Sequence, residues 1–235
     1  AMEVVGIPVL ITRDKESKVP AFRNVCSHRG APLANEEIGN KSKFTCPYHG
    51  WTYSNKGELI GILENYKFGD LDKSCNGLQV LPCEEFGGMI FVTLTPNIKL
   101  NLDKFLGGMK SEIEHFNLKN WHYHGFKVIY GANWKIAFDG YLEGYHFSTA
   151  HKDSILPMTM QGIMDFSSFG PHLRIAFAST NIEEILELPK NEWWKKEGAG
   201  VDFVRTLFPN ISIVNLPNKA PIFTCSIVSP STNFI

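Results

Sequence analysis

The sequence has no excess of charge of either sign and no long apolar segment. Its 235 residues include 23 Lys and Arg against 24 Asp and Glu, so the formal net charge is -1. A nucleic-acid-binding domain would carry a basic stripe, and a membrane span needs about 20 consecutive apolar residues. We therefore expect no binding to nucleic acid or membrane. The first apolar stretch, 4–11, contains Pro8 and lacks a basic flank, so it predicts a strand rather than a signal peptide.

Cysteine is scarce as well, and the five cysteines are odd in number and irregular in spacing. A disulfide-stapled secreted domain would show paired spacings, so the pattern favours a reducing, cytoplasmic location. Two of the cysteines belong to a motif described below. The other three, Cys75, Cys83 and Cys225, are expected to be small buried apolar side chains.

The first part of the chain predicts a small all-β domain. Apolar residues make up 43% of the sequence and charged residues 20%, as in a globular protein with a true core. Short apolar runs alternate with turn signals such as Asn55-Lys56-Gly57 up to the likewise turn-rich Thr95-Pro96-Asn97. The expected strands are Pro8–Thr12, Ala21–Val25, Leu78–Leu81 and Met89–Leu94. We place the domain boundary at residue 97, giving domains of 1–97 and 98–235.

The second part predicts an α+β domain. Helices are expected at 102–116 and 133–146, and strands at 125–130, 173–178, 211–216 and 222–228. The sequence contains no internal repeat and no low-complexity tract. It stops after Phe234-Ile235 with no evident closing element, so we expect it to be a fragment of a longer protein.

Two short motifs in the first domain are typical of a metal site. They are Cys26-Ser27-His28 and Cys46-Pro47-Tyr48-His49. Two thiolates and two imidazoles can hold either tetrahedral zinc or a [2Fe–2S] cluster in which histidines replace cysteines on one iron. The flanks favour the cluster, because Arg29-Gly30 and Gly50-Trp51 complete a pattern that resembles the Rieske signature and that zinc fingers do not show. We predict Cys26, His28, Cys46 and His49 as the cluster ligands.

The resemblance is to the low-potential Rieske proteins of oxygenases and their ferredoxins. Respiratory Rieske proteins have an extra cysteine in each loop, and the matching positions here are Ala31 and Tyr48. Trp51 stands where the respiratory loop has a serine that bonds a cluster sulfur. Neutral imidazoles lower the negative charge around one iron, so such a cluster accepts an electron more readily than an all-cysteine one.

A second constellation lies in residues 133–151, which read NWKIAFDGYLEGYHFSTAH. On a helix, the aromatic side chains would share one face, and Lys135, Asp139, Glu143 and His146 would form the opposite stripe. Alone, such a stripe is typical of a solvent-exposed face. Following a Rieske motif, however, N-W-K and E-x-Y-H-x₄-H together resemble the mononuclear-iron helix in the large, catalytic (alpha) subunit of Rieske non-haem iron oxygenases.

This resemblance implies a mononuclear Fe(II) site. His146 and His151 match two ligands of a two-His-one-carboxylate triad, which leaves positions open for dioxygen. Glu143 matches the family's bridging carboxylate, more often Asp, which links a metal histidine to a cluster histidine of the neighbouring subunit. The family's third ligand is a carboxylate far downstream of the second histidine; Asp153, Asp165 and Asp202 are available, but none has a matching context. Asp139 stands where the family often has Asn close to the iron.

The resemblance also implies a fold and an activity. The fold is a Rieske β-domain followed by an antiparallel sheet cupped around helices (helix-grip-like), in a homotrimer that can include a small beta subunit. The activity is hydroxylation of a small organic, expected aromatic, substrate by dioxygen, with electrons from NAD(P)H. The sequence has no Rossmann glycine fingerprint, so a separate reductase or ferredoxin must deliver the electrons.

Three alternatives stand beside this interpretation. The chain could be a Rieske-type electron carrier without oxygenase chemistry, or a zinc module. The E-x-x-H pairs Glu112/His115 and Glu143/His146 are also found in di-iron bundles, but those need four long helices, which this β-rich sequence does not predict.

Overall fold

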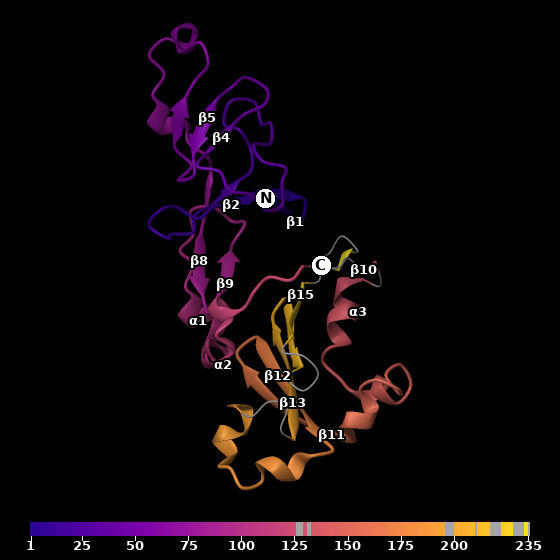
Figure 1. The fold of residues 1–235 in the computed structure, drawn as a ribbon. Coiled ribbons are helices and arrows are strands. Elements are labelled where there is room, and N and C mark those ends of the chain that lie inside the picture. The colour runs from indigo at the N-terminus through magenta and orange to yellow at the C-terminus, as the bar shows by residue number, and fades with distance from the viewer. Residues whose placement is uncertain are drawn as a thin grey trace. The chain divides into compact units, whose positions relative to one another are not determined.

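The computed structural model describes residues 1–125, 129–130, 133–195, 200–209, 211–216, 222–227 and 233–234. The chain divides into two compact units (Figure 1): the first contains residues 1–102 and 117–120, and the second contains residues 103–116 and 121–235. Within the described residues, no helix is long and apolar enough to cross a membrane. The predicted domain boundary at residue 97 stays a prediction.

The first unit is built from antiparallel strands, as its alternating sequence predicts. One sheet has the order β1-β2-β3-β7 (Met2–Val4, Ile7–Ile11, Ala21–Arg23, Val80–Leu81). A second has the order β4-β5-β6 (Lys43–Thr45, Thr52–Ser54, Leu59–Gly61), and β8 and β9 form a hairpin (Cys83–Phe86, Met89–Val92). Three 3-10 helices complete the unit: η1 (Asn65–Phe68), η2 (Lys73–Asn76) and η3 (Leu118–Asn120). Each of the four predicted strands is present: β2 keeps the predicted length but begins and ends one residue earlier, and the other three are shorter than predicted.

The main core of the first unit includes the two motif cysteines. Cys26 and Cys46 pack in one apolar cluster with the buried rings of Phe22, Trp51 and Tyr53. The metal-binding motif is therefore part of the core, and burial of its neighbours fixes the loops that carry it. The remaining cysteines correct one expectation: Cys75 is exposed and bonds Asp72 (Sγ to Oδ2, 3.3 Å), and Cys83 is only partly buried. The Cys225 side chain lies outside the described residues.

The second unit contains a five-stranded antiparallel sheet whose strands follow one another in chain order, β11 to β15. Their bounds are Thr159–Phe169, His172–Ser179, Val201–Leu207, Ile211–Leu216 and Ile222–Ile227. A short pair joins β10 (Ile129–Tyr130) to β16 (Asn233–Phe234). The helices are α1 (Leu102–Leu106), α2 (Met109–Phe116) and α3 (Trp134–Asp139), with 3-10 helices η4 (Tyr145–Ser148), η5 (Leu156–Met158), η6 (Ile182–Ile185) and η7 (Lys190–Lys195). The antiparallel-sheet-plus-helices fold class is confirmed.

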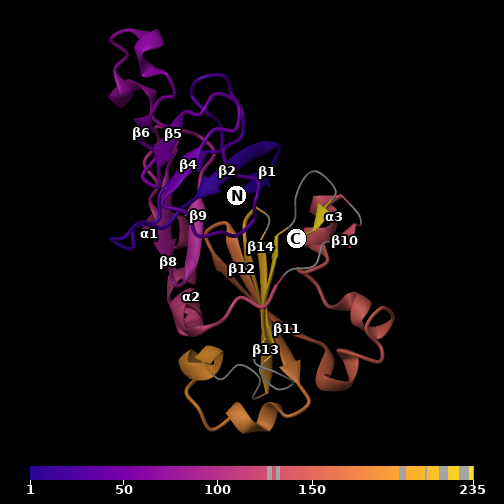
Figure 2. The ribbon, with the colours of Figure 1, turned by 45° about the horizontal axis from the view of Figure 1, so that its top comes forward.

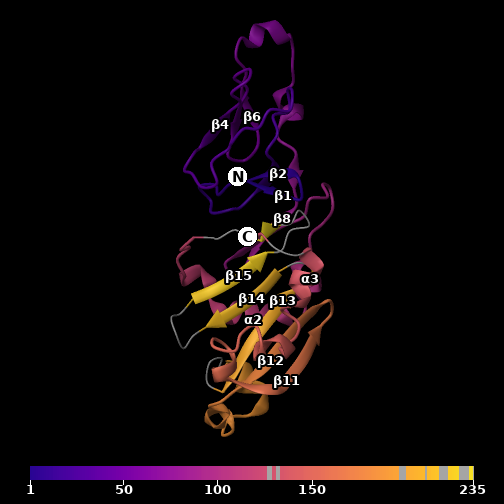
Figure 3. The same ribbon diagram turned by 90° about the vertical axis from the view of Figure 1, so that its right-hand side faces the viewer.

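Helices cover this sheet from both sides. Figures 1 and 2 show α2 on one side and α3 with the segment that follows it on the other, and Figure 3 shows the sheet face-on. On the α2 side, the buried Glu112 carboxylate accepts hydrogen bonds from Arg174 Nη1 (2.6 Å) and Arg205 Nε (2.5 Å). Glu112 is thus the centre of a buried ion network that ties α2 to β12 and β13. This environment does not support its interpretation as a di-iron ligand.

Two predicted helices are shorter than the sequence pattern indicates. The expected helix 102–116 is two helices, because Gly107 adopts a positive φ of 52° between α1 and α2. The expected helix 133–146 ends at Asp139, and Glu143 and His146 lie beyond it. Asn133 caps α3 at its start (Lys135 N–H to Oδ1, 3.0 Å), whereas Gly140 and Gly144 disfavour continuation of the helix. In the predicted strand 125–130, residues 126–128 lie outside the described residues, as does 228 in the strand 222–228.

His172 joins β12 to α1 and to the turn after β13. The ring is fully buried, its Nε2–H donates to Phe105 O (2.6 Å), and its Nδ1 accepts from Phe208 N–H (3.1 Å). These two bonds require the neutral ring, and burial lowers the pKa of His172 despite the Phe105 carbonyl.

We therefore predict an acid-sensitive second unit. Because the pKa of His172 is lower in the folded state, the stability it confers is complete above its unfolded pKa of about 6.5 and decreases as pH falls below that value. The free energy of unfolding, measured with urea from about pH 7.5 down to 5.5, should decrease in wild type. In His172→Gln this decrease should be smaller. The exposed His122→Gln control should retain the wild-type slope, and an unchanged slope in His172→Gln would refute the assignment.

Candidate metal centres

The two motif loops have the same backbone construction. In each loop the glycine N–H donates to the cysteine carbonyl, and the cysteine N–H donates to the residue after that glycine. The bonds are Gly30 to Cys26 (2.9 Å), Cys26 to Ala31 (2.8 Å), Gly50 to Cys46 (3.0 Å) and Cys46 to Trp51 (2.7 Å). Gly30 and Gly50 have φ values of 77° and 69°, which favour glycine. Each loop therefore presents its cysteine and its histidine from the same kind of turn.

The four side chains fit a cluster held by sulfur and nitrogen. Cys26 and Cys46 are both 2% exposed, and the His28 and His49 rings lie 4.7 Å apart, centroid to centroid. The Nδ1 atoms of both histidines are buried and make no hydrogen bond. A buried imidazole nitrogen without a partner is costly, unless a metal takes its lone pair. Burial, and then the charges of His49 and Arg29, lowers the pKa of His28 and favours the neutral ring that a metal requires.

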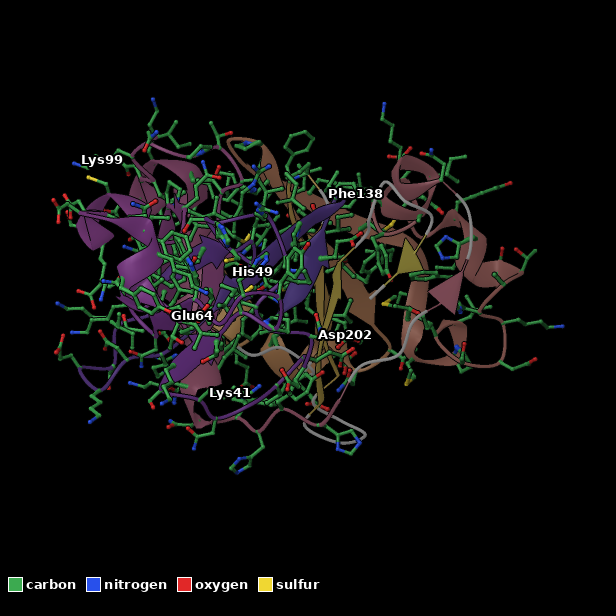
Figure 4. The ribbon with its side chains drawn as sticks, turned by 90° about the horizontal axis from the view of Figure 1, so that it is seen from above. Lys41, His49, Glu64, Lys99, Phe138 and Asp202 are labelled. Atoms are coloured by element: carbon green, nitrogen blue, oxygen red, sulfur yellow. The ribbon has the colours of Figure 1, made fainter. Side chains whose placement is uncertain are left out.

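Aromatic rings fix the two imidazoles. His28 stacks on Trp51 with 4.7 Å between the centroids and 7° between the planes. Tyr48, which is 61% exposed, lies against His49 at 3.8 Å (His49 is labelled in Figure 4). Trp51 therefore holds one histidine in place from within the core, and Tyr48 covers the other from the surface.

The second candidate centre is formed by His146 in η4 and His151 in the turn that follows. Their ring centroids are 5.1 Å apart, and both rings contact Phe147. Glu143 Oε1 bonds His146 Nδ1, and its Oε2 accepts from the Tyr145 and His146 N–H groups. Burial raises the pKa of Glu143, but the bonds with His146 and Tyr145 lower it by more, so the carboxylate stays charged. A histidine ring whose Nδ1–H donates a hydrogen bond to a carboxylate has its free lone pair on Nε2, where it can bind a metal.

Close packing on the sheet explains why this segment is not helical. A Cβ at Gly144 would lie 2.8 Å from the Phe177 ring and 3.1 Å from Met164 Sδ. The chain thus lies directly on β11 and β12, closer than any larger residue would allow. The resulting turn brings Glu143 and His146 together without a regular helix.

In the part of the chain that the structure describes, none of the other candidate carboxylates forms a three-residue metal-binding group with this pair. Asp139 ends α3 with an exposed side chain, and Asp153 and Asp165 are exposed as well. Asp202 is partly buried on β13 and accepts from Ser179 Oγ (2.9 Å). Among the described residues, no three His, Cys, Asp or Glu side chains converge on a position that could hold one metal ion.

Comparisons with known proteins identify both units. A model of the Rieske [2Fe-2S] domain matches residues 1–70, and a model of the ring hydroxylating alpha subunit (catalytic domain) matches residues 117–226. The chain belongs to the Rieske oxygenase alpha-subunit family. A Rieske [2Fe–2S] cluster and a mononuclear iron are therefore its implied cofactors, and the buried, unpartnered Nδ1 atoms of His28 and His49 fit the first of them.

Curated relatives of this Rieske alpha subunit fall into two groups. The large subunit of anthranilate 1,2-dioxygenase from Acinetobacter baylyi is 32% identical over 157 residues, which are 61% of this chain and 32% of that protein. The oxygenase subunit of glycine betaine monooxygenase from Pseudomonas aeruginosa is 35% identical over 147 residues, 62% of this chain and 34% of that protein. The chain thus matches about a third of the length of these relatives.

Solved structures share the fold of this Rieske alpha subunit. A quaternary ammonium Rieske monooxygenase gives a TM-score of 0.82 at 22% identity, covering 99% of this chain and 61% of that one. Naphthalene 1,2-dioxygenase from Rhodococcus sp. gives a TM-score of 0.73 at 25% identity, covering 96% and 60%. A monooxygenase and a dioxygenase therefore share this fold.

Two residues of the Rieske unit were missed by sequence reasoning. The buried Asn24 closes the first loop: its Nδ2 donates to Ala34 O (2.6 Å), and its Oδ1 accepts from Leu33 N–H and Ala34 N–H (both 3.1 Å). Tyr53, fully buried, bonds Cys26 Sγ (3.2 Å) through its hydroxyl. Its position two residues beyond Trp51 is the one available signal, because the alternation that runs from Trp51 into β5 buries both rings.

Tyr53 should raise the reduction potential of the cluster. Its hydroxyl lies 2.8 Å from Ser27 Oγ and accepts from Ser27 N–H (3.1 Å), which aims it at the Cys26 sulfur. Burial, together with the bond to Cys26, raises the pKa of Tyr53 and keeps the phenol protonated. A donor on a ligating sulfur stabilises the more negative, reduced cluster. Voltammetry should show a lower potential in Tyr53→Phe than in wild type, with both irons retained.

An unchanged potential in Tyr53→Phe would exclude this role. Tyr66→Phe, at an exposed position, serves as the matched control and should keep the wild-type potential.

Proposed function

We propose that this chain carries the electron-accepting and dioxygen-activating sites of a Rieske oxygenase. In this proposal Cys26 and Cys46 ligate one iron of a [2Fe–2S] cluster, and His28 and His49 ligate the other through Nδ1. His146 and His151 ligate a mononuclear Fe(II) together with one carboxylate ligand. This chain matches only 32% of the length of its anthranilate dioxygenase relative. The activity, substrate and partners of the whole protein are therefore part of the proposal.

One observation carries this proposal: the same chain contains two groups of side chains that could each bind a metal centre. The first pairs two buried cysteines with two buried, unbonded imidazole nitrogens. The second pairs two histidines, one of which is oriented by a carboxylate. An electron carrier needs only the first group, whereas reductive activation of dioxygen needs both.

The chemistry requires two electrons for each dioxygen molecule. In monooxygenation, two electrons and two protons convert O₂ and a C–H bond into C–OH and water; in dihydroxylation, both oxygen atoms enter the substrate. A [2Fe–2S] cluster held by Cys26, Cys46, His28 and His49 would supply these electrons one at a time, and an Fe(II) held by His146 and His151 would provide the site for dioxygen. Glu143 keeps the proton of His146 on Nδ1, so that Nε2 keeps the lone pair that would ligate the iron. The Trp51 and Tyr48 rings fix the orientation of His28 and His49. These two histidines are the residues through which the electron would leave.

The proposed partners follow from this electron supply. A separate NAD(P)H-dependent reductase, directly or through a ferredoxin, reduces the cluster. We further propose a homotrimer in which the electron leaves through His49 or His28 of one subunit and reaches His146 through Glu143 of the next. A small beta subunit and a cytoplasmic location belong to the same proposal. The relatives' names include aromatic acids and quaternary amines, and the expected aromatic substrate stays a prediction.

Oxidation of the reduced cluster tests the function. In the full-length protein with substrate and Fe(II), dioxygen should reoxidise a chemically reduced cluster at least about tenfold faster than in His151→Ala, with formation of hydroxylated product. Thr149→Ala, in the same turn, should behave like wild type. Equal rates in His151→Ala, without product, would instead favour the electron-carrier alternative, which the catalytic-domain match does not support.

A further inference from the structure

Residues 143–151, which carry His146 and His151 and are called the iron segment below, lie on one face of the sheet. A substrate would meet that face. Phe147 contacts His146 (4.9 Å) and His151 (5.8 Å) between ring centroids, and on the sheet side it contacts Phe177 (5.2 Å). Gly144 also lies against the Phe177 ring. The face of β12 that presents Phe177 is therefore the face that carries the two histidines.

Asp202 lies on this same face. In the antiparallel register, Met164 of β11 pairs with Phe177 of β12, and Phe177 pairs with Asp202 of β13. Directly paired residues point to the same side, with Cβ atoms about 5 Å apart. Asp202 (labelled in Figure 4) is thus the next side chain beyond Phe177 in a row that begins under the iron segment.

No cation in the described part of this face balances the Asp202 carboxylate. Its hydrogen bond from Ser179 Oγ is neutral, and burial raises its pKa despite that bond. Arg174 and Arg205 alternate to the opposite face, where both bind Glu112. The other residues that the register places on this face of β11 to β13 are uncharged: Met164, Phe166, Ser168, Leu173, Ile175, Phe177, Ser179, Val204 and Thr206.

We infer that Asp202 is a specificity-determining residue that binds a cationic group of the substrate, and that the substrate is a quaternary ammonium compound. This inference rests on the proposed oxygenase function. A partly desolvated carboxylate without a counter-ion is unfavourable, and a substrate cation would supply that counter-ion. The neighbouring Phe177 and Phe147 rings add cation–π attraction. A benzoate-type carboxylate would meet like charge and be rejected.

The inference chooses between the two groups of relatives, and it replaces the aromatic substrate expected from the sequence with a quaternary amine. Anthranilate, toluate and 2-halobenzoate name acids, whereas glycine betaine, choline and carnitine name quaternary amines. It also gives Asp202 a role other than the third iron ligand, since Phe177 and Phe147 lie between it and the histidine pair in the chain of contacts.

Equilibrium binding to the oxidised full-length enzyme tests the charge preference without requiring turnover. The probes are choline, its uncharged isostere in which carbon replaces nitrogen, and benzoate. Wild type should bind choline at least about tenfold more tightly than the isostere, about 1.4 kcal/mol. Asp202→Asn should abolish that preference and improve benzoate binding, while iron content stays at the wild-type level. Ser179→Ala, which removes the hydroxyl but keeps the charge, should retain the preference.

The wild-type comparison stands even if Asp202→Asn does not fold. Equal binding of choline and the isostere by wild type would overturn the inference. So would a preference that survives in Asp202→Asn, or loss of iron in that variant, which would make Asp202 a ligand. Failure of the proposed function would give a different result. Dioxygen would then reoxidise the cluster at the same rate with and without the iron, while wild type would still prefer choline to the isostere.

Discussion

Cys46→Ala should bleach the protein and unfold its first unit. The Cys46 side chain is 2% exposed and packs in the same core cluster as Trp51 and Tyr53. Because the site forms only in the folded state, the free energy of cluster binding is also folding free energy. We expect loss of the thiolate-to-iron absorption bands, loss of both cluster irons and a cooperative unfolding transition at much lower temperature, measured by visible absorption and circular dichroism.

The chain offers a matched control for that result. Cys75 is exposed on η2 and is not part of the core cluster, so Cys75→Ala should keep full colour and wild-type unfolding. Full colour with both irons retained in Cys46→Ala would contradict the ligand assignment. Bleaching in Cys75→Ala would show that the assay reports general damage rather than loss of a ligand.

Glu143→Gln should retain both metals and yet slow electron arrival at the mononuclear iron by about a hundredfold or more, the upper end of effects expected from partners of metal ligands. The glutamine amide oxygen can still accept the hydrogen bond from His146 Nδ1–H that Glu143 accepts, but it carries no charge. The histidine then stays in place while the proposed link to the cluster of the neighbouring subunit is weakened. Single-turnover reoxidation of the reduced cluster, measured beside iron content, separates these effects.

Asp139 provides the control for this variant. It lies one turn earlier in the chain with an exposed side chain at the end of α3, so Asp139→Asn should react at the wild-type rate. A wild-type rate in Glu143→Gln would remove its bridging role, whereas loss of the iron would make Glu143 a ligand instead.

The cluster motif was predictable because its geometry is local. Each loop places its cysteine and histidine within three residues of one another, and a glycine with positive φ closes each turn. The strands that carry the loops follow from alternating apolar residues. Asn24 and its bonds to residues 33 and 34 were not predictable, because a polar side chain closing a loop leaves no periodic signal.

The iron segment was harder to predict because tertiary contacts override its periodicity. Apolar spacing indicated one helix over 133–146, but the chain leaves the helix at Gly140 so that Gly144 can lie against Phe177. The sequence correctly indicated that Glu143 and His146 lie close together, although through a turn instead of a helix face. Asp202 had no recognisable context at all, since only the register of β11, β12 and β13 places it beside Phe177.

Metal and sulfide analysis of the full-length protein tests the central claim, two different iron centres in one chain, most directly. We predict about three irons and about two acid-labile sulfides per chain, with no zinc, from one [2Fe–2S] cluster and one mononuclear site. Loss of about one iron with all sulfide retained in His146→Ala would assign the third iron to the second unit. About two irons in wild type, unchanged in His146→Ala, would contradict the account and leave an electron carrier.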